Sequence, residues 1–158
     1  MINLKNQNAF SLLELLIVIA IIVLLATISI IALNGQRAKA RDAKRISDIR
    51  QIKTALEFYH GDEAEYPIEP NPVQLGPQGR VKLCAKSDGG FVPVEQECQK
   101  KLYMSNIPAD PLVGQQFSYT GLKEGYDLVF STEKPSSLGP AGIYHGHSVN
   151  IDTLPGNN

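Results

Sequence analysis

A single carboxylate, Glu14, lies inside a long apolar run near the start of this 158-residue chain. Between Leu12 and Leu33 the only other polar side chains are Thr27 and Ser29. A carboxylate in such a run costs roughly 2–3 kcal/mol to insert into a bilayer, even on lenient scales. Spacing alone leaves two interpretations open. Either Glu14 lies one turn inside the membrane edge and extends to the headgroups, or it pairs with a cation within the apolar layer.

Two further pairs of side chains could do chemistry. Cys84 and Cys98 are the only cysteines, and an even count beyond a membrane segment favours one disulfide in an oxidising compartment, with two unpaired thiols as the alternative. His145 and His147 would share one face of a strand, but no third ligand is evident, so no metal site is predicted. No nucleophile elbow, H-E-x-x-H motif or phosphate-binding glycine loop is present. We therefore expect no catalytic residue, no cofactor and no enzyme activity.

The apolar run predicts a membrane-spanning helix. Its 22 residues would be roughly 33 Å long, enough to cross a hydrocarbon core of about 30 Å. A cleaved secretory signal fits poorly, because the run exceeds the core of such signals and no A-x-A-like site follows it. The expected organisation is a polar segment at 1–9, a transmembrane helix at 10–34, an amphipathic stem helix at 35–60 and a globular, β-rich head at 61–158.

The stem is predicted from an apolar stripe with the period of an α-helix. The stripe consists of Ile46, Ile49, Ile52, Leu56 and Tyr59. No proline interrupts residues 36–60, so one helix should continue from the membrane to about His60, with Gly61 as its stop.

Charge is distributed unevenly along the chain. Residues 37–57 carry seven bases and three acids, a net charge of +4, whereas 61–158 carries seven bases and twelve acids, a net charge of −5. The overall charge of −1 gives no general attraction to nucleic acid, and no nucleic-acid partner is expected. The basic stem could bind anionic lipids or the acidic heads of other copies, or be simply solvated. By the positive-inside rule, it would place the head in the cytoplasm.

The head is expected to hold a small antiparallel sheet packed on the apolar stripe of the stem. Four prolines and two glycines at 66–79 predict an irregular loop after the helix. The candidate strands are Val81–Ala85, Phe91–Val94, Phe117–Thr120, Tyr126–Ser131 and Ile143–Ile151, the third and fourth joined as a hairpin by the five residues 121–125. The expected fold class is α+β, with one long N-terminal helix on a β-sheet head.

The residues around Glu14 resemble a known processing signal. The segment from Ala9 to Ala20, AFSLLELLIVIA, is similar to the class III signal of type IV pilins and type II secretion pseudopilins. The resemblance implies that a prepilin peptidase cleaves between Ala9 and Phe10, making 1–9 a leader peptide, and that Phe10 is N-methylated. The family usually has glycine where this chain has Ala9. It also implies that Glu14 meets the Phe10 amine of a neighbouring subunit in a filament.

The resemblance extends more weakly into the head, where Ala64-Glu65-Tyr66-Pro67 is similar to the exit from the long helix in these proteins. It implies a pilin-like structural subunit held in the inner membrane with an extracytoplasmic head, and we give this more weight than the charge rule. The implied partners are a prepilin peptidase and methyltransferase, other copies and minor pilins, an inner-membrane assembly platform and membrane lipids. No D-x-D-x-D run for calcium is present.

Two classes of function remain open. One is a filament subunit, and the absence of a proline at Ile31 together with the short head favours the major pseudopilin branch. The other is a monomeric, membrane-anchored binding module or enzyme, for which Glu14 would have no role in assembly.

Overall fold

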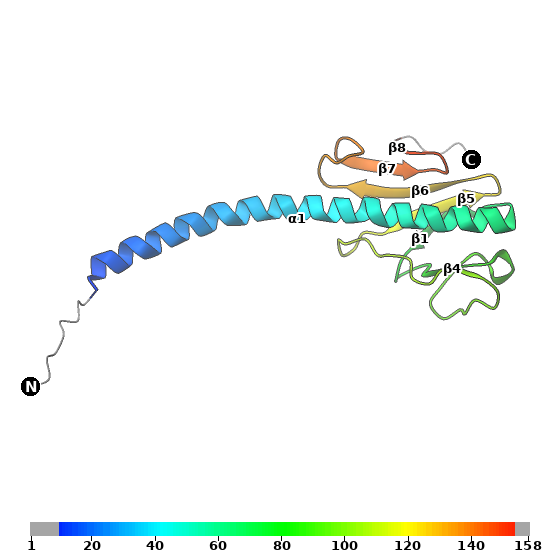
Figure 1. Ribbon diagram of the computed structural model, residues 1–158, viewed down its shortest axis with the longest axis horizontal. Coiled ribbons are helices and arrows are strands. Elements are labelled where there is room, and N and C mark those ends of the chain that lie inside the picture. The colour runs from blue at the N-terminus through cyan, green and yellow to red at the C-terminus, as the bar shows by residue number, and fades with distance from the viewer. Residues whose placement is uncertain (1–9, 154–158) are drawn as a thin grey trace, which may run out of the picture. The chain divides into compact units, whose positions relative to one another are not determined.

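The computed structural model describes residues 10–153 of the chain, so the predicted leader at 1–9, including Ala9, lies outside the described residues. The first element, α1, is a helix of 52 residues, Leu12–Glu63. Two compact units divide the chain, 1–37 and 38–158, and α1 contributes to both. The second unit holds all of the strands (Figure 1).

The end of α1 differs from the prediction. Gly61 lies within the helix, which continues to Glu63. The helix closes at Ala64, whose φ of 57° is left-handed and whose N–H donates to the His60 carbonyl oxygen at 2.9 Å. Two residues later, the Tyr66 N–H donates to the Lys123 carbonyl oxygen at 3.1 Å. The chain therefore turns back on the head at once, and this tertiary bond sets the stop in place of the glycine.

The larger sheet is antiparallel, with strand order β1-β5-β6-β7-β8. Its strands are β1 (Glu69–Leu75), β5 (Phe117–Leu122), β6 (Gly125–Thr132), β7 (Gly142–Gly146) and β8 (Ile151–Asp152). The smaller sheet has the order β3-β2-β4, from β2 (Lys82–Cys84), β3 (Phe91–Val92) and β4 (Leu102–Met104). A single 3-10 turn, η1 (Lys86–Asp88), follows β2.

The prediction of an irregular loop at 66–79 was wrong, because β1 lies within it. Pro70 and Pro72 are tolerated there because β1 is an edge strand of the sheet, paired only with β5. A proline cannot donate to a ladder, and an edge strand needs donors on one side only. The pairing with β5 slips between Glu69 and Val73, where these prolines lie.

Two other boundaries were also misplaced. The β5–β6 hairpin turns on two residues, since Leu122 pairs with Gly125, and the predicted five-residue loop does not exist. The predicted strand Ile143–Ile151 is two strands, β7 and β8, which pair with each other across the turn at 147–150. Strand β4 was not predicted.

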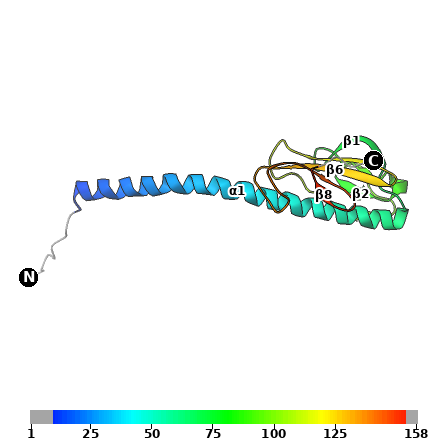
Figure 2. The ribbon, with the colours of Figure 1, turned by 90° about the horizontal axis from the view of Figure 1, so that it is seen from above.

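The core lies between the second half of α1 and the larger sheet, which covers one side of that helix segment (Figure 2). The predicted stripe is confirmed, because all five members are at most 6% exposed. Strand β6 alternates between partly and fully buried residues along its whole length. Its buried side chains include Tyr126, Leu128 and Phe130, which join the helix stripe in one apolar cluster. Burying each large side chain contributes roughly 1.5–3 kcal/mol.

Cys84 and Cys98 form a disulfide, with their Cα atoms 5.5 Å apart. Cys84 is fully buried at the end of β2. The bond therefore fixes the loop between β3 and β4 to the smaller sheet.

Candidate functional site

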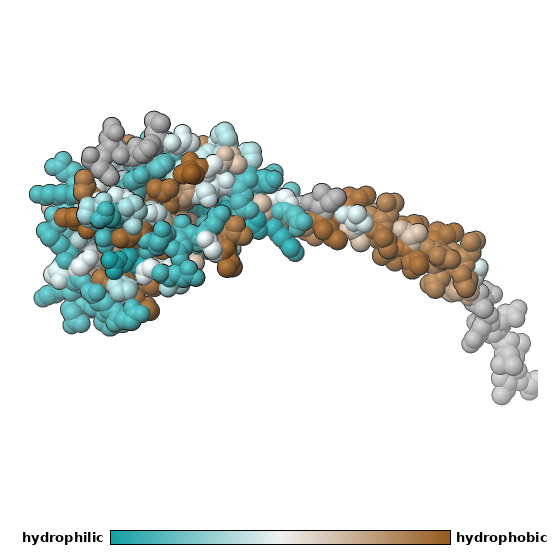
Figure 3. Space-filling view, turned by 180° about the vertical axis from the view of Figure 1, so that it is seen from behind, coloured by the Kyte–Doolittle hydropathy of each residue, from teal (hydrophilic) through white to brown (hydrophobic). Residues whose placement is uncertain are grey.

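The first half of α1 carries a continuous apolar surface that nothing in its own unit covers. Every residue from Phe10 to Ile30 is exposed, and Phe10 is 78% exposed. Figure 3 shows this surface as an almost uninterrupted brown band. By length and composition, α1 is the one helix among the described residues that could cross a membrane. Such a surface requires lipid or other protein around it.

The polar side chains within the apolar surface differ in how they are satisfied. Thr27 Oγ1 donates to the Val23 carbonyl oxygen at 2.8 Å, and Ser29 Oγ donates to the Leu25 carbonyl oxygen at 2.9 Å. These bonds to the preceding turn spare both hydroxyls the cost of burial without a partner. The Glu14 carboxylate has no hydrogen-bond or ion-pair partner among residues 10–153.

Glu14 occupies the third position of α1, where the backbone favours negative charge. The Leu15 N–H donates to the Ser11 carbonyl oxygen at 3.2 Å, so Ser11 stands at the N-cap. Ser11 and Glu14 thus have the S-x-x-E spacing of a capping box, which the sequence analysis overlooked. The free N–H groups of the first turn give this helix end a partial positive charge. The start of the helix therefore partly stabilises the negative charge of Glu14.

The stem is attached to the head by a buried cluster of charges around Arg45, whose side chain is fully buried. Arg45 Nε and Nη2 donate to the two oxygens of Asp110, each at 2.8 Å. Arg45 Nη1 donates to Asp42 at 2.7 Å and to Glu133 at 2.8 Å. Arg41 Nε also donates to Glu133, at 2.7 Å. Two arginines of α1 thereby hold a carboxylate from each of two separate segments of the head.

The cluster contains three carboxylates but two arginines, and backbone N–H groups stabilise the excess negative charge. Asp42 accepts from the N–H groups of Glu133 and Lys134 at 2.9 and 2.8 Å, and Asp110 accepts from the Leu112 N–H at 2.8 Å. A buried charge is tolerated only when it is paired and hydrogen-bonded in this way. The hydrogen bonds to Asp110 raise the pKa of Arg45. The hydrogen bonds from Arg41, then Arg45, lower the pKa of Glu133 from 4.5 to about 2.

This cluster is the functional feature that the sequence analysis missed. Its signal was the phase of the apolar stripe, because the same helical spacing continued backwards from Ile49 and Ile46 reaches Arg45 and Asp42. A charged pair in the phase of a core stripe predicts a buried ion pair. The partners Asp110 and Glu133 lie far along the chain, and no local pattern marks them.

The predicted site residues fall into separate places. Phe10 and Glu14 lie four residues apart at the start of α1, whereas Ala9 lies outside the described residues and the disulfide belongs to the second unit. His145 lies on β7 and His147 in the turn that follows it, so they do not share one strand as predicted, although their rings are 6.2 Å apart and nearly parallel. His145 Nδ1 lies 2.8 Å from Asp127. Within residues 10–153, no group of three or more His, Cys, Asp or Glu side chains is placed to hold a metal ion.

Comparisons with known proteins found a matching family at the N-terminus and similar proteins over most of the chain. The family described as the prokaryotic N-terminal methylation motif matches residues 4–30. The type II secretion system core protein G of Escherichia coli (strain K12) is 33% identical over 136 residues, covering 81% of this chain and 88% of that protein. Its counterpart in Klebsiella michiganensis is 30% identical over 128 residues, covering 81% and 84%. No solved structure matches the chain significantly.

We predict that Arg45→Ala lowers the free energy of unfolding by about 3–5 kcal/mol, because it leaves buried carboxylates without their cation. The measurement is urea unfolding of the full chain in detergent, followed by tyrosine fluorescence. Arg50→Ala is the control, since this exposed side chain has no partner among the described residues and its loss should change stability by at most about 0.5 kcal/mol. Equal losses in the two variants would contradict the role given to the cluster.

Stability should also fall in acid through Glu133. Its folded pKa, about 2, lies below its ordinary value of 4.5, so it stabilises the folded state fully above pH 4.5. That contribution is lost as the pH falls from 4.5 towards 2. Urea midpoints measured across this window should decline less steeply for Glu133→Gln than for the unchanged chain. Parallel declines would show that the Glu133 ion pairs do not contribute.

Proposed function

This chain belongs to the family of type II secretion system core protein G, the major pseudopilins, and we propose that it assembles through its N-terminal helix into a filament after a prepilin peptidase cleaves between Ala9 and Phe10. In this proposal the peptidase also methylates the new Phe10 amine. Other copies, minor pseudopilins and an inner-membrane assembly platform are the partners. The head would carry no catalytic function.

The observation that carries this proposal is the exposed apolar surface from Phe10 to Ile30, with one unpartnered carboxylate near its start. A lipid bilayer would satisfy the apolar side chains before assembly, and neighbouring helices would satisfy them in a filament. Neither environment satisfies an isolated carboxylate. In the proposed filament Glu14 lies within the apolar layer, away from the headgroups, so a cation has to be supplied with the covering surface.

Cleavage would supply that cation. Removal of 1–9 creates a positive amine on Phe10, four residues before Glu14. Unpaired, both charges are penalised in an apolar layer, and pairing offsets that penalty. A subunit displaced along the filament axis would bury the Glu14 carboxylate and the Phe10 amine without their partners. The pair thus favours one axial register between neighbouring subunits.

The proposed topology has the head outside the cytoplasm, as the leader signal and the disulfide suggest. The charge rule opposes it, but several of the seven stem bases are not free. Arg41, Lys44 and Arg45 form ion pairs with acids of the stem or head. The leader signal and the disulfide are given more weight than the charge rule in this proposal.

Replacing the carboxylate tests this proposal. Glu14→Leu should leave the chain in the membrane, because the substitution only extends the apolar run. Filament yield should fall by about tenfold or more, because the Phe10 amine of each neighbour would be left without a partner and breaking such a pair costs about 3–5 kcal/mol. The measurement is the amount of sheared filament relative to membrane-bound subunit, in a cell with an active assembly system.

Leu16→Ile is the matched control, an apolar exchange in the same stretch of helix, and it should assemble normally. Normal filaments from Glu14→Leu would contradict the pairing. They would favour a membrane-anchored monomer whose helix serves only as an anchor.

A further inference from the structure

A groove lies between α1 and the turn that joins β7 to β8. Its volume is about 400 Å³, and it is lined by Arg50, Lys53, Thr54, Glu57, Asn150 and Ile151. One wall is a cationic stretch of helix, and the other is the end of the turn with an apolar side chain beside it. Both walls belong to the unit that contains the head.

The two cations of this groove have hydrogen-bond donors to spare. Lys53 Nζ donates to the Asn150 carbonyl oxygen at 3.0 Å, whereas an ammonium carries three N–H donors. Burial lowers the pKa of Lys53 from its ordinary 10.5, so its charge is incompletely solvated. The Arg50 guanidinium has no acceptor among residues 10–153. A carboxylate entering the groove would satisfy both side chains with charge-assisted hydrogen bonds.

The acid already in the groove does not fill this role. The Tyr66 hydroxyl donates to Glu57, at 3.2 Å from each of its oxygens. Glu57 also forms no ion pair within 4.0 Å in the described part of the chain. Glu57 thus acts on Lys53 only through space, and both cations keep hydrogen-bond donors for another carboxylate.

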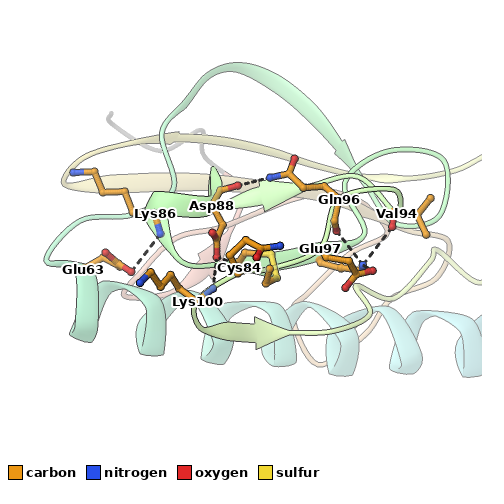
Figure 4. The surroundings of a disulfide bond; sticks show 11 residues. Glu63, Cys84, Lys86, Asp88, Val94, Gln96, Glu97 and Lys100 are labelled. Atoms are coloured by element: carbon orange, nitrogen blue, oxygen red, sulfur yellow. Dashed lines mark hydrogen bonds and ion pairs between the residues drawn. A yellow bond between two sulfur atoms is a disulfide. The ribbon is translucent and has the colours of Figure 1, made fainter.

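The loop from β3 to β4 is held in one shape by bonds at both ends. Cys98 is joined to Cys84 on β2. The ammonium of Lys82, also on β2, donates to the carbonyl oxygens of Val94 and Gln96 at 3.3 and 3.0 Å. Figure 4 shows Val94 and Gln96 in this arrangement beside the disulfide. A loop fixed in this way loses little conformational entropy when it binds a partner.

The fixed loop presents an apolar residue next to an unpaired acid. Val94 is 56% exposed, and Glu95 is exposed and has no ion-pair partner among the described residues. The nearby Glu97 is different, because it pairs with Lys82 at 2.7 Å. Val94 and Glu95 are chemically complementary to the groove. The apolar Val94 could contact Ile151, and the Glu95 carboxylate could pair with Arg50 and Lys53.

The loop and the groove lie on opposite flanks of α1, with β7 and β8 on one side and β4 on the other (Figure 1). Within one copy they do not meet. Between two copies, a contact that joins different patches is heterologous, and it builds an open helical array when its rotation does not close a ring. A second copy of this chain is therefore the occupant that fits both the chemistry and the placement.

We infer that the loop bearing Val94 and Glu95 docks into the Arg50–Lys53 groove of a neighbouring copy, with the Glu95 carboxylate between the two cations and Val94 against Ile151. This contact rests on the proposed filament function and adds a head-to-stem interface to the Glu14 pair. It also gives the disulfide a role, which is to hold the docking loop in its binding shape.

Cysteine crosslinking in assembled filaments tests the contact. The variant Thr54→Cys with Glu95→Cys should give a ladder of covalent dimers, trimers and longer species on oxidation. The native cysteines are bonded to each other and do not compete. Thr54→Cys with Glu124→Cys is the control, since Glu124 is an exposed head acid on the β5–β6 turn, and it should give no ladder. Filaments of the first variant without a ladder would overturn the inference.

Charge reversal gives a second, independent test on the full chain. Glu95→Arg alone, and Arg50→Glu with Lys53→Glu, should each lower the filament yield by about tenfold, because like charges facing each other at an interface cost several kcal/mol. The three substitutions together should restore it, and Glu124→Arg should have no effect. Normal yields from both reversed variants would overturn the inference and leave the proposed function intact. Failure of the unchanged chain to assemble would instead contradict the proposed function.

Discussion

The apolar surface from Phe10 to Ile30 has no cover within its own unit, and the organisation of the molecule follows from that constraint. A continuous helix has to be stable first in lipid and then among other proteins. Its backbone is satisfied internally in either environment, and its two hydroxyls bond to the preceding turn. Glu14 is the charged side chain of this surface, and it has no such bond. A single charge can fix the axial position of a neighbouring helix, whereas uniform apolar contacts allow it to slide.

The second half of the same helix attaches the head to the stem. The apolar stripe gives most of the burial, but apolar side chains tolerate sliding along a sheet. The Arg45 cluster does not, because its hydrogen bonds to Asp42, Asp110 and Glu133 have one geometry. Removing Arg45 would leave the buried carboxylates of Asp42 and Asp110 without their cation. The cluster therefore sets the register between the stem and the head, as the Glu14 pair is proposed to do between subunits.

Much of this structure could be predicted because its causes are local. The helix stripe at 46–59 and the β5–β6 hairpin follow from periodicity and turn residues. The errors have non-local causes. Pro70 and Pro72 suggested a loop, but whether a proline is tolerated in a strand depends on its being at a sheet edge, which topology decides. Arg45 was one of the stem bases for which lipid binding, pairing with heads of other copies and solvation stayed open, because its partners in the head lie 65 and 88 residues further along the chain. The role proposed for Glu14 rests on resemblance to a family.

The most direct test of this account is the mass of the mature N-terminal peptide, taken from membranes of a cell with an active prepilin peptidase. The account predicts a chain that begins at N-methylated Phe10, because the Glu14 carboxylate requires a new amine in the apolar layer. A chain that keeps Met1 under the same conditions, while a known prepilin in that cell is cleaved, would contradict it. In that case no amine would exist at Phe10, and the proposed charge pair could not form.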